Sequence, residues 1–426
     1  MSSTEPSSNL AHAGASTAIQ AEDARLPALV FWSWLLSRLL FFGPLMLATQ
    51  RQPPGALASR LGQWDAAHYL QIVQQGYAGD NFAFFPVFPY LIRLTSSLLH
   101  LPPLAVALVF SNGAFLLALV LLHRLSRHYQ GSAIARTVVL LSCFNPMSIF
   151  CAIPYTESFY LLFTCQALLA LLRPRLNAPR IAIFGALSAA TRPTGLVIAP
   201  AILVAYGRRH RLAAGLVVAL LALAGVGIVA LIDLQRSGDP LAFVHAQQAW
   251  HVQPGLNLSG LPSWRKLLSQ VFLGLANTKA GALVDRSHPI LITATLLLGL
   301  GAFRLRQRRP GTSFVLSLVV LLAYWLLAGM PGLNLLVVLG AVLLAIWGYR
   351  RLPLELWVFG AASLLLYLLK QNTISLERHI FATAPLLMLY GAWFDAHPGW
   401  RRFLLGFGSL LLLLYALRFA NGLWIG

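Results

Sequence analysis

Residues 211–234 read RLAAGLVVALLALAGVGIVALIDL, and no charged side chain lies between Arg211 and Asp233. An apolar run of this length predicts a helix that crosses a bilayer core about 30 Å thick. Similar runs recur along the chain, of which 58% is hydrophobic and only 10% charged. The sequence therefore predicts an all-α, polytopic integral membrane protein.

Hydropathy predicts about thirteen transmembrane helices, the first over residues 26–47. The other twelve are expected at residues 103–123, 134–151, 154–172, 180–191, 194–206, 211–234, 288–303, 312–328, 331–348, 353–369, 379–394 and 402–420. Residues 1–25 are rich in Ser, Ala and Thr and lack an apolar core, which predicts a disordered cytoplasmic tail. We expect residues 26–426 to form a single transmembrane domain.

The net charge of +19 is spread in short basic clusters between apolar runs. This distribution is typical of loops facing the cytoplasm, so it disfavours nucleic acid as a partner and indicates the bilayer instead. More than half of the 31 basic residues fall in inside connectors if the N-terminus is cytoplasmic. The same topology leaves two long outer loops, residues 48–102 and 235–287, in which we expect interfacial helices.

This orientation requires residues 180–206 to form a hairpin that turns near residues 191–195. One long helix would instead place Arg208 and the arginines after it on the outer side. Each arm spans only about 18 to 20 Å, so the turn should lie below the outer surface. Arg192 is then either a snorkelling cation at a Pro/Gly turn or a functional charge at membrane depth.

The first outer loop contains Gly62-Gln63-Trp64-Asp65-Ala66-Ala67-His68-Tyr69. Apolar residues at helical spacing from residue 65 to 75 predict a short interfacial helix that begins near Asp65. Asp65 can therefore be an N-cap or a catalytic carboxylate. Asp65 and His68 alone form a poor divalent site, and three scattered cysteines have no metal-ligand spacing, so we predict no metal and no cofactor.

Several blocks of the chain carry a family resemblance. They are Trp64-Asp65 with His68-Tyr69, residues 83–89 (AFFPVFP), residues 145–150 (NPMSIF), residues 155–158 (YTES) and residues 191–195 (TRPTG). In this order they are similar to the PIG-V family of mannosyltransferases, which are membrane-embedded GT-C glycosyltransferases. Eukaryotic members tend toward Arg-Ser-Asn-Gly at Arg192-Pro193-Thr194-Gly195, so the acceptor stays open. Three lysines against 28 arginines suggest a bacterial member.

The resemblance implies an inverting transfer of mannose from polyprenyl-phosphate mannose to an acceptor hydroxyl on a lipid-linked glycan or glycolipid. Asp65 matches the general base of the family. Arg192 and Arg378 are candidates for binding the donor phosphate, because fixed cations stabilise a leaving anion. The candidates for binding sugar or acceptor are Glu157, His68, Tyr69, Gln247 and Trp250.

Some alternatives stay open. Glu157 can be a helix-starting acid, Arg378 can pair with Glu377 on the surface, and Trp250 can be an interfacial anchor. The whole chain can also be a flippase or transporter of lipid-linked sugars, or a GT-C transferase of another sugar such as arabinose. For the transferase we expect a multi-pass protein of the bacterial plasma membrane with its active site on the outer, periplasmic side.

Overall fold

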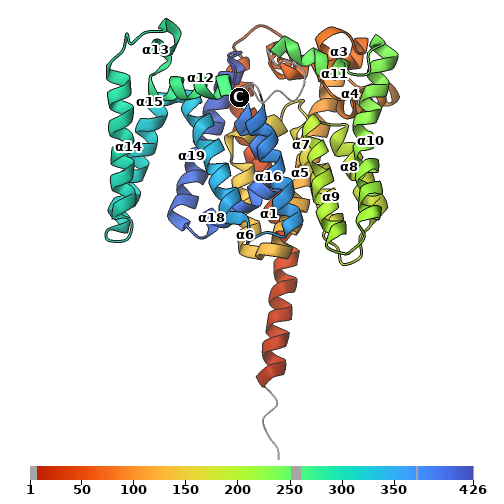
Figure 1. The fold of residues 1–426 in the computed structure, drawn as a ribbon, viewed down its shortest axis with the longest axis horizontal. Coiled ribbons are helices and arrows are strands. Elements are labelled where there is room, and N and C mark those ends of the chain that lie inside the picture. Colours follow the sequence, from red (N-terminus) through yellow and green to blue (C-terminus); the bar gives the residue numbers. More distant parts are fainter. Residues whose placement is uncertain (1–6, 251–260, 371–372, 426) are drawn as a thin grey trace, which may run out of the picture. The chain divides into compact units, whose positions relative to one another are not determined.

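The structure, a computed structural model, describes residues 7–250, 261–370 and 373–425. Over these residues it is built from helices without a β-strand (Figure 1), which confirms the all-α class. Residue contacts divide the chain into two compact units. The first contains residues up to 76, residues 84–228 and residues 387–425, and the second contains residues 77–83 and 229–386. The range predicted as a single domain is thus divided between both units.

The first unit consists mainly of long and medium helices. They are α1 (Ser7–Thr49), α2 (Ala56–Leu61), α3 (Asp65–Gln75), α4 (Val87–Leu99), α5 (Pro103–Gln130), α6 (Ser132–Cys143), α7 (Glu157–Leu171), α8 (Ala178–Ala189), α9 (Ile198–Gly207), most of α10 (Leu212–Ser237), most of α18 (Ala384–Asp395) and α19 (Pro398–Ala420). Two 3-10 turns, η2 (Pro146–Cys151) and η3 (Pro193–Val197), lie in the connections before α7 and α9.

The second unit contains the predicted second long loop and the helices that follow it. Its elements are η1 (Gly79–Ala83), α11 (Ala242–His245), η4 (Ala246–Trp250), α12 (Leu261–Phe272), α13 (Leu275–Ala280), α14 (Ser287–Leu305), α15 (Pro310–Gly348), α16 (Leu354–Leu369) and α17 (Leu376–Phe381). Short helices inside both predicted long loops agree with the expectation that these loops are folded.

Among the residues that the structure describes, six helices are long and apolar enough to cross a membrane: Pro27–Thr49 of α1, α5, α10, α14, α15 and α19. Several other predicted spans coincide with shorter apolar helices, such as α7 and α16. The span predicted at 134–151 instead continues past the end of α6 into η2, and the span predicted at 379–394 is divided between α17 and α18. Two predicted spans, at 312–328 and 331–348, form the single element α15, which is kinked at Gly329 (φ 57°, ψ −144°) before Pro331. A multi-pass protein is therefore confirmed, and the count of thirteen stays a prediction.

The first helix begins earlier than the sequence indicates. Helix α1 starts at Ser7, inside the segment for which we predict a disordered tail. The physical reason lies in composition, because this segment is rich in alanine, the residue with the highest helix propensity.

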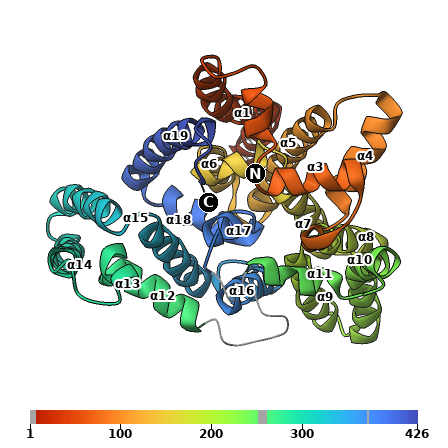
Figure 2. The same cartoon turned by 90° about the horizontal axis from the view of Figure 1, so that it is seen from above.

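The predicted hairpin at residues 180–206 is confirmed within the first unit. At one end of the helices, the Tyr160 hydroxyl near the start of α7 donates to the carbonyl of Thr194, 3.4 Å away. At the other end, Arg209 Nη2 after α9 donates to the carbonyl of Arg173 after α7, 3.2 Å away. Helices α7 and α9 therefore run in the same direction, with α8 returning between them, and Figures 1 and 2 show these helices side by side.

The short helix predicted after Trp64 is also confirmed, with the expected bounds Asp65–Gln75, and its place at the membrane interface stays a prediction. Tyr69 of α3 packs with Phe88 of α4 and Phe159 of α7 in one buried apolar cluster. Figure 2 shows α3 beside α4. This packing fixes the start of α3, where Asp65 lies, against the N-terminal end of α7.

Candidate active site

Asp65 is the first residue of α3, and Trp64 occupies the N-cap position before it. The interpretation of Asp65 as the N-cap residue is therefore wrong, although an acid in the first turn is still favoured by the helix dipole. Trp64 has φ 56° and ψ −129°, a backbone conformation that costs a non-glycine residue about 1 to 3 kcal/mol. Its ring packs edge-on against Phe419 at 5.4 Å and Trp424 at 5.0 Å, which stabilises this conformation.

His68 and Tyr69 follow one turn after Asp65, so the three side chains share a face of α3. The imidazole of His68 stacks on the ring of Phe84 at a centroid distance of 4.5 Å. The ring of Tyr69 meets Phe84 edge-on at 5.1 Å and Phe88 at 5.2 Å. The AFFPVFP block of residues 83–89 thus supplies the wall on which this face of α3 packs.

Glu157 and Arg192 form a buried ion pair. Arg192 Nη1 lies 2.6 Å from Glu157 Oε1, and the two side chains are 11% and 1% exposed. Glu157 is the first residue of α7, while Arg192 is extended (φ −154°, ψ 147°) in the connection between α8 and η3. The hairpin therefore does bury the Arg192 cation, as predicted, and it places an acid against it.

Tyr69 connects α3 to this ion pair. Its hydroxyl donates to Thr156 Oγ1, 3.3 Å away, in the residue directly before Glu157. Burial raises the pKa of the Tyr69 phenol; the hydrogen bond to Thr156 and the charge of Arg192 oppose this shift, and the carboxylates of Asp65 and Glu157 add to it. Two acids and one guanidinium thus lie within electrostatic range of one phenol, which brings four of the predicted site residues together.

Arg378 belongs to the second unit, in the short helix α17, and is buried. The interpretation of Glu377 and Arg378 as a surface pair is therefore wrong, because Glu377 is buried as well. Burial raises the pKa of the Glu377 carboxyl, and the charges of Arg378 and Lys370 oppose that shift. The adjacent His379 stacks on Tyr367 at 5.7 Å, and its Nε2 lies 3.4 Å from Lys370 Nζ.

The other two predicted residues, Gln247 and Trp250, lie in η4 of the second unit. Gln247 is partly buried, whereas the side chain of Trp250 lies outside the described part of the structure. Just before η4, His245 Nδ1 lies 2.6 Å from Asp239 Oδ2 in an exposed contact. The backbone N–H of Leu241 and the contact with His245 both lower the pKa of Asp239.

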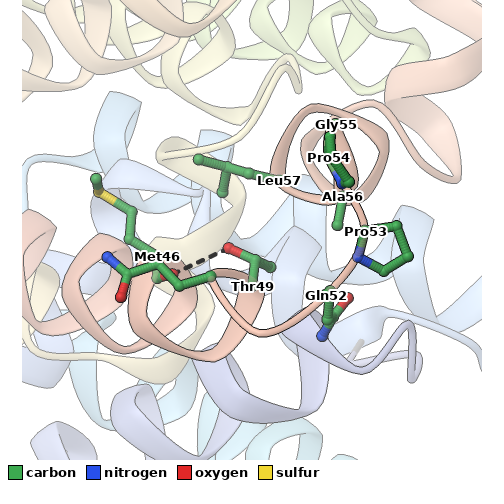
Figure 3. Close-up of a pocket in the computed structure, with 9 residues that line it drawn as sticks. Met46, Thr49, Gln52, Pro53, Pro54, Gly55, Ala56 and Leu57 are labelled. Carbon is green, nitrogen blue, oxygen red and sulfur yellow. Dashed lines mark hydrogen bonds between the residues drawn. The ribbon is translucent and has the colours of Figure 1, made fainter.

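A cavity of about 320 Å³ lies elsewhere in the first unit, where α1 ends and α2 begins (Figure 3). It is lined by Met46, Thr49, Gln50 and residues 52–57, and the Thr49 hydroxyl donates to the carbonyl of Met46 there. None of its lining side chains is charged and none is a predicted site residue. It lacks the groups that acid–base chemistry requires.

Two contacts of the site were not predicted from the sequence. Thr156 is the hydrogen-bond acceptor for Tyr69, and Phe84 packs against both His68 and Tyr69. Both residues lie within blocks that the family resemblance singles out, so that resemblance was the available signal. Within residues 7–250, 261–370 and 373–425, no cluster of three or more His, Cys, Asp or Glu side chains could hold a metal ion.

Fold and site together define a multi-pass helical membrane protein with a buried acid–guanidinium cluster at the start of α7. Residues 49–211 match the family model described as mannosyltransferase (PIG-V), so that part of the chain is similar to this family. The matched segment contains Asp65 and Tyr69 of α3 as well as the ion pair of Glu157 and Arg192. The resemblance read from the sequence motifs is therefore confirmed over these residues.

Curated relatives agree with this assignment. GPI alpha-1,6-mannosyltransferase 2 of Rattus norvegicus is 35% identical over 155 residues, which is 33% of this chain and 31% of the rat protein. The enzyme of Homo sapiens with the same name is 35% identical over 132 residues, covering 28% of this chain and 26% of the human protein. The similarity thus spans about a third of these relatives or less.

The similar solved structures have lower sequence identity to this chain. The oligosaccharyltransferase of Archaeoglobus fulgidus, crystallised with Zn and sulfate, aligns with a TM-score of 0.46 and 13% identity, covering 92% of this chain and 53% of that one. ArnT of Cupriavidus metallidurans, bound to undecaprenyl phosphate, aligns with a TM-score of 0.37 and 16% identity, covering 90% of this chain and 76% of that one.

Proposed function

We propose that this protein is an inverting mannosyltransferase that uses polyprenyl-phosphate mannose as its donor and a hydroxyl of a lipid-linked glycan or glycolipid as its acceptor. The observation that carries the proposal is the convergence of Asp65, Glu157 and Arg192 around Tyr69, inside the segment that matches the PIG-V model. A carboxylate and a guanidinium in one site are the two charges that this reaction needs.

In the proposed mechanism, Asp65 is the general base. The acceptor oxygen attacks the anomeric carbon of mannose, and its proton passes to the Asp65 carboxylate. The bond between the anomeric carbon and the phosphate oxygen breaks, and its electron pair leaves with the polyprenyl phosphate. Attack from the face opposite the leaving group accounts for inversion. The half-buried position of Asp65 at the start of α3 suits such a base.

Arg192 is the proposed stabiliser of the leaving phosphate. A preorganised cation in a site of low dielectric stabilises developing negative charge strongly. A guanidinium has five N–H donors, so Arg192 can bind Glu157 through Nη1 and a phosphate through others. We therefore propose that Glu157 orients Arg192, in place of the hydroxyl-binding role inferred from sequence.

The remaining predicted residues keep their proposed roles. Arg378 is a second candidate for the donor phosphate, and Gln247 and Trp250 are candidates for the sugar. His68, held flat on Phe84, and Tyr69, held by Thr156, form the proposed wall of the sugar site.

The charge distribution supports a site on the outer face of the membrane. Glu157 starts α7 and Arg192 precedes α9, while Arg173 and Arg209 lie together at the opposite ends of these helices. Arginine-rich loops favour the cytoplasmic side. We therefore propose that the site faces outward, and that the protein belongs to a bacterial plasma membrane.

The test is a transfer assay with the purified full chain in detergent. Radiolabelled polyprenyl-phosphate mannose is incubated with a bacterial lipid extract, and the labelled product is identified. We expect Asp65→Asn to lower the transfer rate by about 10²- to 10⁴-fold, the usual contribution of a general base, without loss of donor binding. The matched control is Asp80→Asn, which removes an exposed carboxylate in the same predicted loop.

Two outcomes would reject the proposal. Transfer by Asp65→Asn at the wild-type rate would exclude Asp65 as the base. Transbilayer movement of the donor without any labelled product would favour the flippase instead. The same assay with labelled polyprenyl-phosphate arabinose separates mannose from the alternative sugar.

A further inference from the structure

The chain between α6 and α7 is an irregular segment inside the protein. Residues 144–156 contain η2 and then a series of turns and bends that ends directly before Glu157, and residues 147–156 are all buried. Carbonyl groups of a non-helical segment lack the regular partners that a helix supplies. When such groups are buried away from water, each unsatisfied one is costly, so other donors must be provided.

Arg38 supplies the first of these donors. It lies on α1, within the apolar span Pro27–Thr49, and is 4% exposed. Its Nη1 and Nη2 both donate to the carbonyl oxygen of Ser148, each at 3.2 Å. The Nε atom donates to the Ser37 hydroxyl at 3.2 Å, and the guanidinium lies over the ring of Phe115 at 5.1 Å. The bond to Ser148 joins residues 110 positions apart in the sequence.

Helix α5 supplies the next two donors. Asn112 Nδ2 donates to the carbonyl of Ala152 at 2.8 Å, and the Ser111 hydroxyl donates to the carbonyl of Tyr155 at 3.4 Å. Trp34 of α1 donates from its indole nitrogen to the carbonyl of Asn112 at 3.2 Å, which ties α1 to α5. Side chains of two long helices therefore hold three carbonyls of the irregular segment along its length.

The end of this segment is connected to the site. Thr156, the residue after the last held carbonyl, accepts the hydrogen bond from Tyr69, and Glu157 binds Arg192. A shift of the segment would move both contacts. A buried cation within an apolar span is costly and is usually retained for function, and this one makes its charge-assisted bonds to the backbone of residue 148.

We propose that Arg38, assisted by Asn112 and Ser111, is a positioning residue that fixes residues 144–156 and thereby the placement of Glu157 and Arg192. Arg38 touches no substrate in this role. The catalytic consequence rests on the proposed transferase function, whereas the effect on the segment does not. The two parts can therefore be tested separately.

The structural part is tested by amide hydrogen exchange of the full chain in detergent. In Arg38→Gln we expect the amides of residues 148–156 to exchange about tenfold faster or more, because the segment opens locally. Exchange in α8, which makes none of the hydrogen bonds to residues 144–156 described above, should stay as in the wild type. Arg38→Lys keeps the positive charge but loses the pair of N–H groups that both donate to Ser148, so we expect an exchange rate between those of the wild type and Arg38→Gln.

Two further variants sharpen the test. Asn112→Ala removes the donor to Ala152 without disturbing any charge, and it should speed exchange at residues 152–156. The matched control is Arg401→Gln, because Arg401 binds Asp395 Oδ1 at 2.6 Å and Thr137 in the same unit but not the irregular segment. It should leave residues 148–156 unchanged.

Two exchange results would overturn the proposal. Wild-type exchange at residues 148–156 in both Arg38→Gln and Asn112→Ala would show that neither donor holds the segment. Equal acceleration of exchange in α8 would show that Arg38 stabilises the whole unit and has no special role in positioning.

In the transfer assay, Arg38→Gln should lower kcat about tenfold while KM for the donor stays near the wild-type value. Absence of transfer by the wild type would reject the proposed function, but the exchange result would still stand.

Discussion

Arg192 Nη1 lies 2.6 Å from Glu157 Oε1, and this buried pair joins the start of α7 to the connection between α8 and α9. Each charge lowers the cost of burying the other, because two ions removed from water are tolerated only as a close pair. The two residues are therefore expected to act as one unit, both in stability and in the proposed catalysis.

Breaking this pair on one side should be costly. Arg192→Met leaves the Glu157 carboxyl buried without its cation, and we expect a loss of about 3 to 5 kcal/mol in the free energy of unfolding. The double variant Glu157→Gln/Arg192→Met removes both charges, so most of that stability should return. The transfer rate of the double variant should stay as low as that of Arg192→Met, because the proposed phosphate cation is absent. Thermal denaturation in detergent and the transfer assay check the two statements.

A double variant that is less stable than either single variant would contradict the coupling of the two charges. A double variant that recovers both stability and transfer would contradict the role of Arg192 in catalysis.

Gly195→Ala should disturb the position of Arg192. A Cβ atom at residue 195 would lie 2.4 Å from the backbone of Ser188 and Ala189, too close for any side chain. The 3-10 turn η3 must then move, and we expect a loss of about 1 to 3 kcal/mol together with slower transfer. Gly113→Ala on α5 is the matched control, since its Cβ would meet nothing within 4 Å. This control should be stabilised by about 0.5 to 1 kcal/mol. Equal midpoints of thermal unfolding for the two variants would contradict the close packing of η3.

Glu377 in α17 should make stability depend on pH. Burial raises the pKa of its carboxyl above the ordinary value of 4.5. Below pH 4.5 the carboxyl is protonated in both the folded and unfolded chain, so its contribution is complete there. Above pH 4.5 the unfolded chain releases the proton first, and this contribution to stability is lost as the pH rises through the folded pKa.

Glu377→Gln keeps the side chain neutral and should therefore remove this dependence. Between pH 4 and pH 7, the melting temperature of Glu377→Gln minus that of the wild type should increase as the pH rises. Asp80→Asn, at an exposed position, controls for the loss of a carboxylate. A constant difference between Glu377→Gln and the wild type over this range would refute the raised pKa.

Much of the architecture could be predicted because it depends on local patterns. The apolar run at residues 211–234 coincides with α10, and the helical spacing after Trp64 yields α3 with the expected bounds. The hairpin around Arg192 could be predicted because the arginines after α9 should face the cytoplasm, which requires two helices rather than one between residues 180 and 206. The kink at Gly329 falls between the spans predicted at residues 312–328 and 331–348.

The blocks of the family resemblance located the site residues, but their contacts could not be predicted. Nothing local to Glu157 shows that its partner is Arg192, 35 positions later, or that Tyr69 binds Thr156, 87 positions away. Arg38 was visible only as a charge inside the first span. Its bond to Ser148 depends on how α1 packs beside the η2 turn, which is a matter of helix placement and rotamer.

The sequence by itself determined the helical membrane class, the bounds of α3 and the burial of Arg192, because hydrophobicity and helical period act over a few neighbouring residues. Only the tertiary structure decided which charges pair and which carbonyls are held. These contacts join residues that are distant in sequence, and a shift of about one helical turn in the packing of α1, α5 or α7 would exchange their partners.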